Sequence, residues 1–378
     1  MPPPAPPPTP PASFPSTPIA QLLGSNGPIH AITYSTPPSP YILTGSSDRL
    51  IRLYNPSTTT PIPPPNPNSI TPTPSPSPTT PPSARLITTF PPLHSHPITS
   101  LSISPTNSLI LSSGGDRTLF LWDVATLQST RRFHGHIGRI NTVTFSGASG
   151  DSLAVSGGLD ATVRVWDLRS GSGGGGKAVQ VMSEAKDAVT SVICTSHEIV
   201  AGSVDGRVRG YDVRMGRVVT DVIGASVTSL SLSPGGGETV LVGGLDSKVR
   251  LMDRRDGVCL KTYQAQGWRN EGVRVQSCFG GGGRWVVAGD EFPPEGEAGE
   301  GRVWAWDVMT GGVVARLGVP WGAGGRGKVV GRDGREKGRR NVVSCVAWKE
   351  GGPGGGGEQF CVGGTSGVGT VFGVGTGR

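Results

Sequence analysis

The sequence is poor in the residues from which disulfide frameworks, metal centres and membrane spans are built. Its 378 residues include only five cysteines and six histidines, and the cysteines stand singly, with no CxxC spacing. No run approaches the roughly 18 apolar residues of a membrane helix, and the opening MPPPAPPPTPPASF lacks the basic and apolar segments of a signal peptide. We therefore expect a soluble intracellular protein with buried, reduced thiols and no metal or other cofactor.

Helical periodicity is also nearly absent. Residues 138–145, 152–158 and 161–167 instead alternate apolar and polar side chains, with short Gly, Ser and Asp breaks between them. Asp205-Gly206 marks a tight hairpin, because both residue types tolerate a positive φ. These patterns predict an all-β chain of short strands.

One motif recurs along these strands. SGGLDATVRVWDLRSG at 156–171 returns as AGSVDGRVRGYDVRMG at 201–216, and in both an Asp is followed six residues later by an aromatic residue and a second Asp. The motif has seven copies: Asp48 with Tyr54, Asp116 with Trp122, Asp160 with Trp166, Asp205 with Tyr211, Asp246 with Met252 and, more weakly, Glu300 with Trp306 and Ser366 with Phe372.

The spacing of the clean copies indicates the architecture. Neighbours are 44, 45 and 41 residues apart, a period typical of four-stranded propeller blades. Radial repetition also leaves only short, protected sheet edges. We predict a single seven-bladed β-propeller over residues 17–378, closed by an outermost strand at 17–23. The Pro-rich tail 1–16 and the low-complexity insert 56–83 are expected to be disordered, and 322–341 to be a Gly/Arg-rich loop.

The residues within the copies carry a family resemblance. Gly135-His136, Ser156, Asp160 and Trp166-Asp167 resemble the WD-repeat family, in which His, Ser or Thr, Asp and Trp form a buried hydrogen-bonded network. The resemblance assigns this structural role to His94, Ser112, Asp116 and Trp122 in blade two, and to His136, Ser156, Asp160 and Trp166 in blade three. Blade one offers Ser25, Thr44, Asp48 and Tyr54 for these places, blades four and five lack the His, and blades six and seven lack the Asp as well.

Part of the chain resembles one group within that family more specifically. HEIVAGSVDGRVRGYDVRMG at 197–216, GGDRTLFLWDVAT at 114–126 and FHGHIGRINTVTF at 133–145 are similar to the mitogen-activated protein kinase organizers. The resemblance implies a non-enzymatic scaffold, monomeric within larger complexes, in the cytoplasm and the nucleus. Its partners would be spliceosomal and kinase-cascade proteins, with RNA contacted at most indirectly and no membrane involved.

Two alternatives remain open: a WD-repeat adaptor with other partners, and a propeller enzyme or nucleotide-binding protein. The pairs HSH at 94–96 and HGH at 134–136 offer too few ligands for a metal. GSGGGGKA at 171–178 misses the phosphate-binding pattern GxxxxGK[ST] at Ala178 and leads into a strand-like segment. The repeated Asp residues stand at hairpin turns, where they stabilise the turn.

Surface charge is the remaining functional signal. Residues 325–340 hold seven Lys/Arg and two acidic residues, and contribute most of the formal charge of +7. This loop would lie on the face of the Asp turns and either contacts RNA phosphate or an acidic protein surface, or is a solvated insertion. The candidate partner-binding residues are Arg326, Lys328, Arg332, Arg335, Lys337, Arg339 and Arg340.

The Pro-rich insert contains dipeptides that indicate regulation by phosphorylation or that occur there by chance. Thr-Pro and Ser-Pro dipeptides are accepted by proline-directed kinases, although a tract of this composition also contains them by chance. They stand at Thr60, Thr71, Thr73, Ser75, Ser77 and Thr80.

Overall fold

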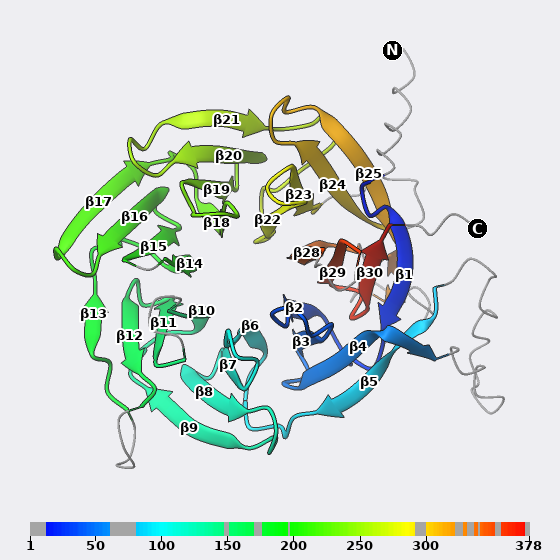
Figure 1. Ribbon diagram of the computed structural model, residues 1–378, viewed down its shortest axis with the longest axis horizontal. Helices are drawn as coiled ribbons and strands as arrows, with labels where there is room; N and C mark the ends of the chain where they lie inside the picture. The colour runs from blue at the N-terminus through cyan, green and yellow to red at the C-terminus, as the bar shows by residue number, and fades with distance from the viewer. Residues whose placement is uncertain are drawn as a thin grey trace.

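The strands of the protein are arranged around a central axis, as Figure 1 shows for the computed structural model. The structure describes residues 13–60, 81–146, 151–169, 176–195, 197–291, 300–321, 328–330, 336–338, 341–351 and 357–374. Over these residues the secondary structure consists of β-strands joined by turns, and no helix that could cross a membrane is found among them. The predicted all-β propeller fold is confirmed.

Five separate sheets have four antiparallel strands each. Blade two contains β6 (Ile98–Ile103), β7 (Leu109–Gly114), β8 (Thr118–Asp123) and β9 (Ser129–His134); blade three contains β10 (Ile140–Phe145), β11 (Leu153–Gly158), β12 (Val163–Asp167) and β13 (Gln180–Met182). Blade four contains β14 (Val189–Cys194), β15 (Glu198–Ser203), β16 (Arg207–Asp212) and β17 (Arg217–Val222). Blade five contains β18 (Val227–Leu232), β19 (Thr239–Gly244), β20 (Lys248–Asp253) and β21 (Cys259–Tyr263); blade six contains β22 (Ser277–Gly280), β23 (Trp285–Gly289), β24 (Gly301–Asp307) and β25 (Val313–Val319).

The two ends of the chain meet in one eight-stranded sheet. Its first half is blade one, with β2 (Ile29–Tyr34), β3 (Ile42–Ser46), β4 (Ile51–Thr60) and β5 (Ser83–Thr89). Its second half, blade seven, combines β28 (Val343–Lys349), β29 (Gln359–Gly364) and β30 (Gly369–Gly373) with β1 (Thr17–Leu22). A single parallel bridge, Gln21 to Ser83, joins the halves. The ring of described strands thus consists of five four-stranded sheets and this eight-stranded sheet.

Strand β1 closes the ring. It pairs antiparallel with β30 from Thr17–Gly373 to Leu22–Gly369, and Figure 1 shows the blue N-terminal strand beside the red C-terminal one. This confirms the closing role predicted for residues 17–23. The pairing removes an exposed sheet edge that would otherwise invite association.

Two predicted boundaries are wrong. Phe14, assigned to the disordered tail 1–16, is 1% exposed, and its ring lies 5.7 Å from Trp285 and 5.9 Å from Phe360 (centroid distances). The fold therefore begins before Thr17, because an aromatic side chain between blades six and seven gains enough from burial to order the backbone around it. The insert 56–83 is also shorter than expected: Pro56 to Thr60 continue β4 and Ser83 begins β5. Residues 61–80 lie outside the described chain.

The core lies between neighbouring blades. Leu111 and Leu119 of blade two, for example, pack with Ile140 and Val143 of blade three. Glycine permits this close approach: a Cβ on Gly157 would lie 2.5 Å from Val189 of the next blade. Burial of apolar side chains contributes roughly 25 cal/mol per Å², so these interfaces, repeated around the ring, supply the main stabilisation of the fold.

Candidate interaction face

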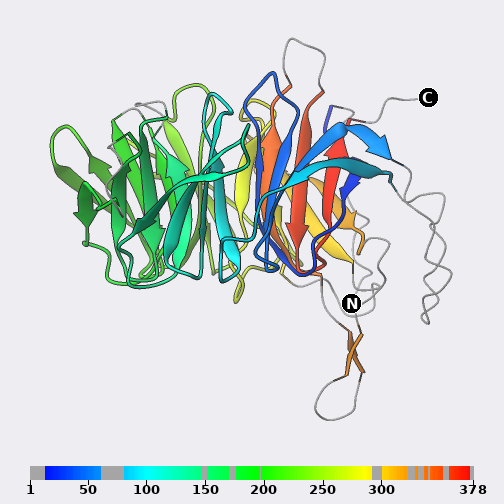
Figure 2. The same ribbon diagram turned by 90° about the horizontal axis from the view of Figure 1, so that it is seen from below.

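One face of the ring carries the repeated Asp turns, and we call it the Asp face. It is formed by the turns between the second and third strands of the blades and by the loops that enter each innermost strand. The β26–β27 hairpin (Lys328–Val330 and Glu336–Gly338) belongs to the loop between β25 and β28 and projects from this side, at the bottom of Figure 2. The Asp turns are Asp48, Asp116, Asp160, Asp205 and Asp246.

Blade three contains a four-residue network beneath this face. His136 Nδ1 lies 2.9 Å from Asp160 Oδ1, and His136 Nε2 lies 2.7 Å from Ser156 Oγ. Trp166 Nε1 donates to the same hydroxyl at 2.9 Å. An ionised carboxylate only accepts, so Nδ1 carries the proton and Nε2 accepts from the Ser156 hydroxyl. The structure thus brings together all four residues predicted for this blade.

Blade two repeats the arrangement. His94 Nδ1 lies 2.7 Å from Asp116 Oδ2, His94 Nε2 lies 2.7 Å from Ser112 Oγ, and Trp122 Nε1 donates to Ser112 at 2.8 Å. Asp116 also accepts the backbone N–H of Ser95 at 3.3 Å, which ties the entering loop to the Asp turn. The four predicted residues again lie in one network.

The Ser–His–Asp order matches the hydrogen-bonded order of a hydrolase triad. Ser156 is 0% exposed, however, and its oxygen already accepts the indole N–H of Trp166. A substrate carbonyl cannot reach this hydroxyl. The network is therefore structural, and what it offers to the surface is a rigid turn and a rigid loop.

Burial sets the protonation of the blade-three network. Desolvation lowers the pKa of His136 below 6.5 despite the opposing effect of Asp160. Burial alone would raise the pKa of Asp160, but contacts with His136 and the backbone N–H of Ile137 lower it. A neutral imidazole beside an ionised carboxylate is the state that these directions favour at neutral pH.

Blades one and four hold their Asp turns with arginine, a solution that the sequence analysis missed. Arg52 Nη2 donates to Asp48 Oδ2 at 2.6 Å, and Arg209 Nη2 donates to Asp205 Oδ2 at 2.6 Å. Burial alone would raise the pKa of both carboxyl groups, but the arginine and serine hydrogen bonds lower each pKa to about 2. Blade five has the same pairing, between Arg250 and Asp246.

The residue two positions before the Asp distinguishes the blades that anchor the Asp with histidine from blades one and four, which anchor it with arginine. Where His is present, Gly158 stands two residues before the Asp, and a Cβ there would lie 2.7 Å from His136 Nδ1. Where His is absent in blades one and four, this residue is Ser46 or Ser203, whose hydroxyl donates to the Asp carboxylate. Serine two residues before the Asp with arginine four residues after it could have predicted these pairs.

Blade six differs from the prediction. Glu300, assigned to the Asp place, is exposed, whereas Asp290 is 0% exposed and accepts Trp304 Nε1–H at 2.9 Å. The backbone N–H of Arg269 also donates to Asp290, as that of Ile137 does to Asp160. The assignment of Glu300 was wrong because extra residues separate Asp290 from the aromatic strand. In blade seven, Ser366 Oγ accepts the N–H of Val368 at 3.3 Å, a local turn contact.

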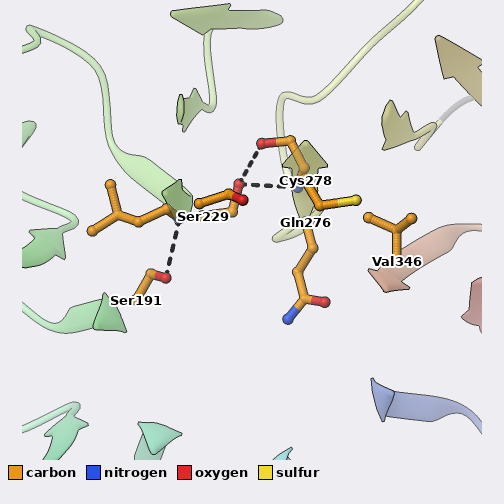
Figure 3. A pocket seen from close by; sticks show the side chains of 8 residues that line it. Ser191, Ser229, Gln276, Cys278 and Val346 are labelled. Atoms are coloured by element: carbon orange, nitrogen blue, oxygen red, sulfur yellow. Dashed lines mark hydrogen bonds between the residues drawn. The ribbon is translucent and has the colours of Figure 1, made fainter. Parts of the chain in front are cut away.

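The central channel is lined by hydroxyl groups of the innermost strands. Ser100, Ser191 and Ser229 each accept a backbone N–H of the next blade, at 3.2, 3.1 and 3.1 Å. Figure 3 shows Ser191 and Ser229 beside Gln276, around a hollow of about 190 Å³ in the channel wall. These bonds hold successive blades in register around the axis.

The other predicted residues are less fully described. His96 is exposed and contacts Ser95, and His134 contacts Thr118; the described residues contain no group of three metal-ligating side chains. Of the basic loop, only the backbone of Lys328 and Lys337 is described, in β26 and β27. Its other predicted residues lie outside the described chain: Arg326, Arg332, Arg335, Arg339 and Arg340.

Comparison with known proteins agrees with this geometry. The model of the WD domain, G-beta repeat family matches residues 16–55, 85–123 and 127–167. WD repeat domain-containing protein 83 of Rattus norvegicus is 38% identical over 141 residues, which are 37% of this chain and 41% of that protein. Its homolog in Dictyostelium discoideum is 26% identical over 78% of this chain and 86% of its own length. Autophagy-related protein 16 of Arabidopsis thaliana is 27% identical over 58% of this chain and 41% of that protein.

The fold and the three matched repeats are similar to those of WD-repeat β-propeller proteins. It is similar to the WD repeat domain-containing protein 83 group, although the match spans only about two fifths of the length of the rat relative. The WD-repeat resemblance found in the sequence is thereby supported over the three matched segments.

Proposed function

We propose that this protein is a non-enzymatic scaffold whose Asp face assembles protein complexes. The observation that carries the proposal is the basic hairpin on that face: the segment 325–340 has seven Lys/Arg against two acidic residues, and its strands β26 and β27 project from the ring (Figure 2). The buried networks support it, because they fix the Asp turns and the entering loops into a rigid surface. A rigid rim loses little conformational entropy when a partner binds.

The partners we propose are spliceosomal proteins and, as a second association, components of a mitogen-activated protein kinase cascade. Both rest on the resemblance of residues 114–126, 133–145 and 197–216 to the kinase organizers. The basic loop favours the first, because RNA-rich assemblies are strongly anionic and attract basic surfaces. The protein would then be found in both nucleus and cytoplasm.

Affinity purification of the tagged protein from nuclear and cytosolic extracts, followed by mass spectrometry, tests this function. We expect spliceosomal proteins from the nuclear extract and several kinases of one cascade from the cytosol. Recovery of spliceosomal proteins should fall when the seven basic residues of the loop are changed to Ser: Arg326, Lys328, Arg332, Arg335, Lys337, Arg339 and Arg340.

A control variant removes basic charge from the opposite face. Arg169, Arg214 and Arg255 follow β12, β16 and β20 at the ends away from the Asp turns, and all three are exposed. Changing them to Ser should leave recovery unchanged. A native sample that recovers neither class of partner refutes the proposed function, and equal recovery with the neutralised loop refutes the role of the loop.

A further inference from the structure

The loop between β21 and β22 lies on the Asp face and is held by side-chain hydrogen bonds. Trp268 Nε1 donates to Gly289 O at 2.7 Å, and Asn270 Nδ2 donates to Gly244 O at 3.0 Å. The Glu291 carboxylate accepts two successive backbone N–H groups of the loop at 2.7 and 2.8 Å. These bonds fix the loop that carries Arg274.

Arg274 reaches across the channel mouth. Its Nε donates to Thr228 O of blade five at 2.9 Å, and its Nη1 donates to Asn141 O of blade three at 3.0 Å. Since Arg274 itself precedes β22 of blade six, this side chain joins blades that are not neighbours. Its Nη2 has no hydrogen-bond partner among the described residues and remains available as a donor.

A second guanidinium lies beside it. Arg139 is exposed, and its Nε donates to Asn141 Oδ1 at 3.0 Å, so Arg139 and Arg274 meet at the same asparagine. Burial and the charge of Arg139 lower the pKa of Arg274 to about 10, and burial followed by the same charge lowers the pKa of His30. Neither arginine forms an ion pair within the described part of the chain. Two like charges that contact the same residue favour an anion between them.

We propose that Arg139 and Arg274 at the channel mouth bind a carboxylate side chain of an acidic segment in a partner protein. The inference rests on the proposed scaffold function and names the chemistry of one partner. Guanidinium groups suit carboxylates because their N–H donors form two parallel, charge-assisted bonds. The hollow beside Ser191, Ser229 and Gln276 offers polar space for a neighbouring side chain of the partner.

An acidic peptide fits this site better than RNA does. Proteins that bind single-stranded nucleic acid usually stack bases on exposed aromatic side chains. The large apolar side chains exposed in the described chain are Leu, Ile, Val and Met, and none is aromatic. The site also offers two guanidinium groups that meet at one asparagine, rather than a row of basic side chains that follows a phosphate backbone.

Selection from a displayed library of random 12-residue peptides on the immobilised full-length protein tests the inference. We expect enriched peptides to carry Asp or Glu at one fixed position. The enriched peptide is then synthesised, together with its Gln or Asn counterpart, and binding to each is measured by fluorescence anisotropy. Arg139→Gln should weaken binding about tenfold, the usual effect of losing one charged hydrogen bond, and abolish the preference for the acid over the amide.

Matched variants make the test specific. Lys186→Gln removes an exposed charge from another loop of the Asp face and should change the affinity less than about twofold. Arg274→Gln should weaken binding as Arg139→Gln does. Because Arg274→Gln also loses two hydrogen bonds to backbone carbonyls, the melting temperature of this variant is measured. If Arg274→Gln unfolds, Arg139→Gln alone tests the site.

The outcomes separate this inference from the proposed function. Peptides that bind without an acidic preference, or equally well to Arg139→Gln, refute the carboxylate site while leaving the scaffold function standing. A 12-residue oligouridine that binds more tightly than the peptide, and loses affinity in Arg139→Gln, assigns the site to RNA phosphate and refutes the inference. A library from which nothing is enriched refutes the site, and the separate affinity purification then decides the scaffold function.

Discussion

Blades three and four are neighbours with almost the same motif, yet they hold their Asp turns in different ways. In blade three, His136 comes from the preceding loop, 24 residues before Asp160, and joins that loop to the turn. In blade four, Arg209 comes from the same hairpin as Asp205, four residues later. The histidine therefore fixes two loops of the Asp face to each other, whereas the arginine fixes one hairpin to itself.

Blade four keeps a weaker tie between its loops. The backbone N–H of Lys186 donates to Asp205 Oδ2 at 3.0 Å, as the N–H of Ile137 does to Asp160 in blade three. The side chain in the histidine place is Ala185, which has no polar group. The comparison shows that the repeat preserves the anchored Asp, while the group that anchors it can change.

The largest expected effect is on the tryptophan of blade three. Trp166 is 1% exposed, so Trp166→Ala should lower the free energy of unfolding by about 3–5 kcal/mol through the cavity it leaves. Trp166→Phe keeps most of the volume and loses only the hydrogen bond to Ser156, at a cost of about 1 kcal/mol. Urea unfolding followed by circular dichroism measures both, and similar losses for the two variants would contradict the cavity as the main cause of the loss in Trp166→Ala.

The second effect compares arginines in equivalent places. Arg209→Met should cost about 3 kcal/mol, because it leaves Asp205 without its buried partner. Arg164→Met in blade three should cost less than about 1 kcal/mol, because Arg164 lies 3.7 Å from an Asp160 already held by His136. Equal losses in the free energy of unfolding, measured with urea, would mean that arginine anchors the Asp to the same extent in both blades.

The third prediction tests whether a serine two residues before the Asp is incompatible with the histidine that anchors the Asp in blade three. His136→Ala should cost about 1–3 kcal/mol, since Asp160 and Ser156 lose a partner. Gly158→Ser should also destabilise, because the new Cβ would meet His136 Nδ1 at 2.7 Å. In the double variant the contact with His136 is gone and only the contact with Asp160 Oδ1, at 2.6 Å, remains, so a coupling of about 1 kcal/mol is expected from a double-mutant cycle. Strict additivity would show that glycine and histidine are independent.

The smallest effect is on pH dependence. The pKa of His136 is lower in the folded protein than in the unfolded chain, so the unfolded chain binds a proton more readily. The contribution of neutral His136 to the stability of the fold is therefore present above about pH 6.5 and is lost as the pH falls further. The pKa values of Asp48 and Asp205 are lowered to about 2, so their contribution persists down to about pH 3.8 and is lost as the pH falls towards 2. Urea midpoints at pH 7.5 and 5.5 should differ less for His136→Gln than for the native chain, and an unchanged difference would exclude His136 as a source of this dependence.

Periodicity predicted most of the fold, because the copies from Asp116 to Asp246 repeat the same strands at spacings of 44, 45 and 41 residues. It also predicted the residues of the blade-two and blade-three networks, which the structure brings together. Phe14 was missed because a Pro-rich composition says nothing about a single aromatic residue that finds a pocket between two other blades. Asp290 was missed because an insertion lengthens its turn, and counting from the aromatic residue then leads to Glu300.

The arginine pairs and the channel mouth were missed for a different reason. Arg209 looked like one polar residue in an alternating strand, and only the fold shows it turned back onto Asp205. Arg139 and Arg274 are distant in sequence, and the closure of the ring is what brings both to Asn141. Contacts across the axis depend on all blades together, so no local pattern can predict them.

The central claim is that partners bind on the Asp face, and cross-linking mass spectrometry of the tagged protein with its captured partners tests it most directly. Lysines are present at both ends of the blades: Lys186, Lys248, Lys328 and Lys337 lie towards the Asp face. At the opposite end, Lys261 Nζ donates to Met309 O in the turn after β24, and Lys349 ends β28. The account predicts that partner cross-links concentrate on the first four. Cross-links that concentrate on Lys261 and Lys349 would contradict it.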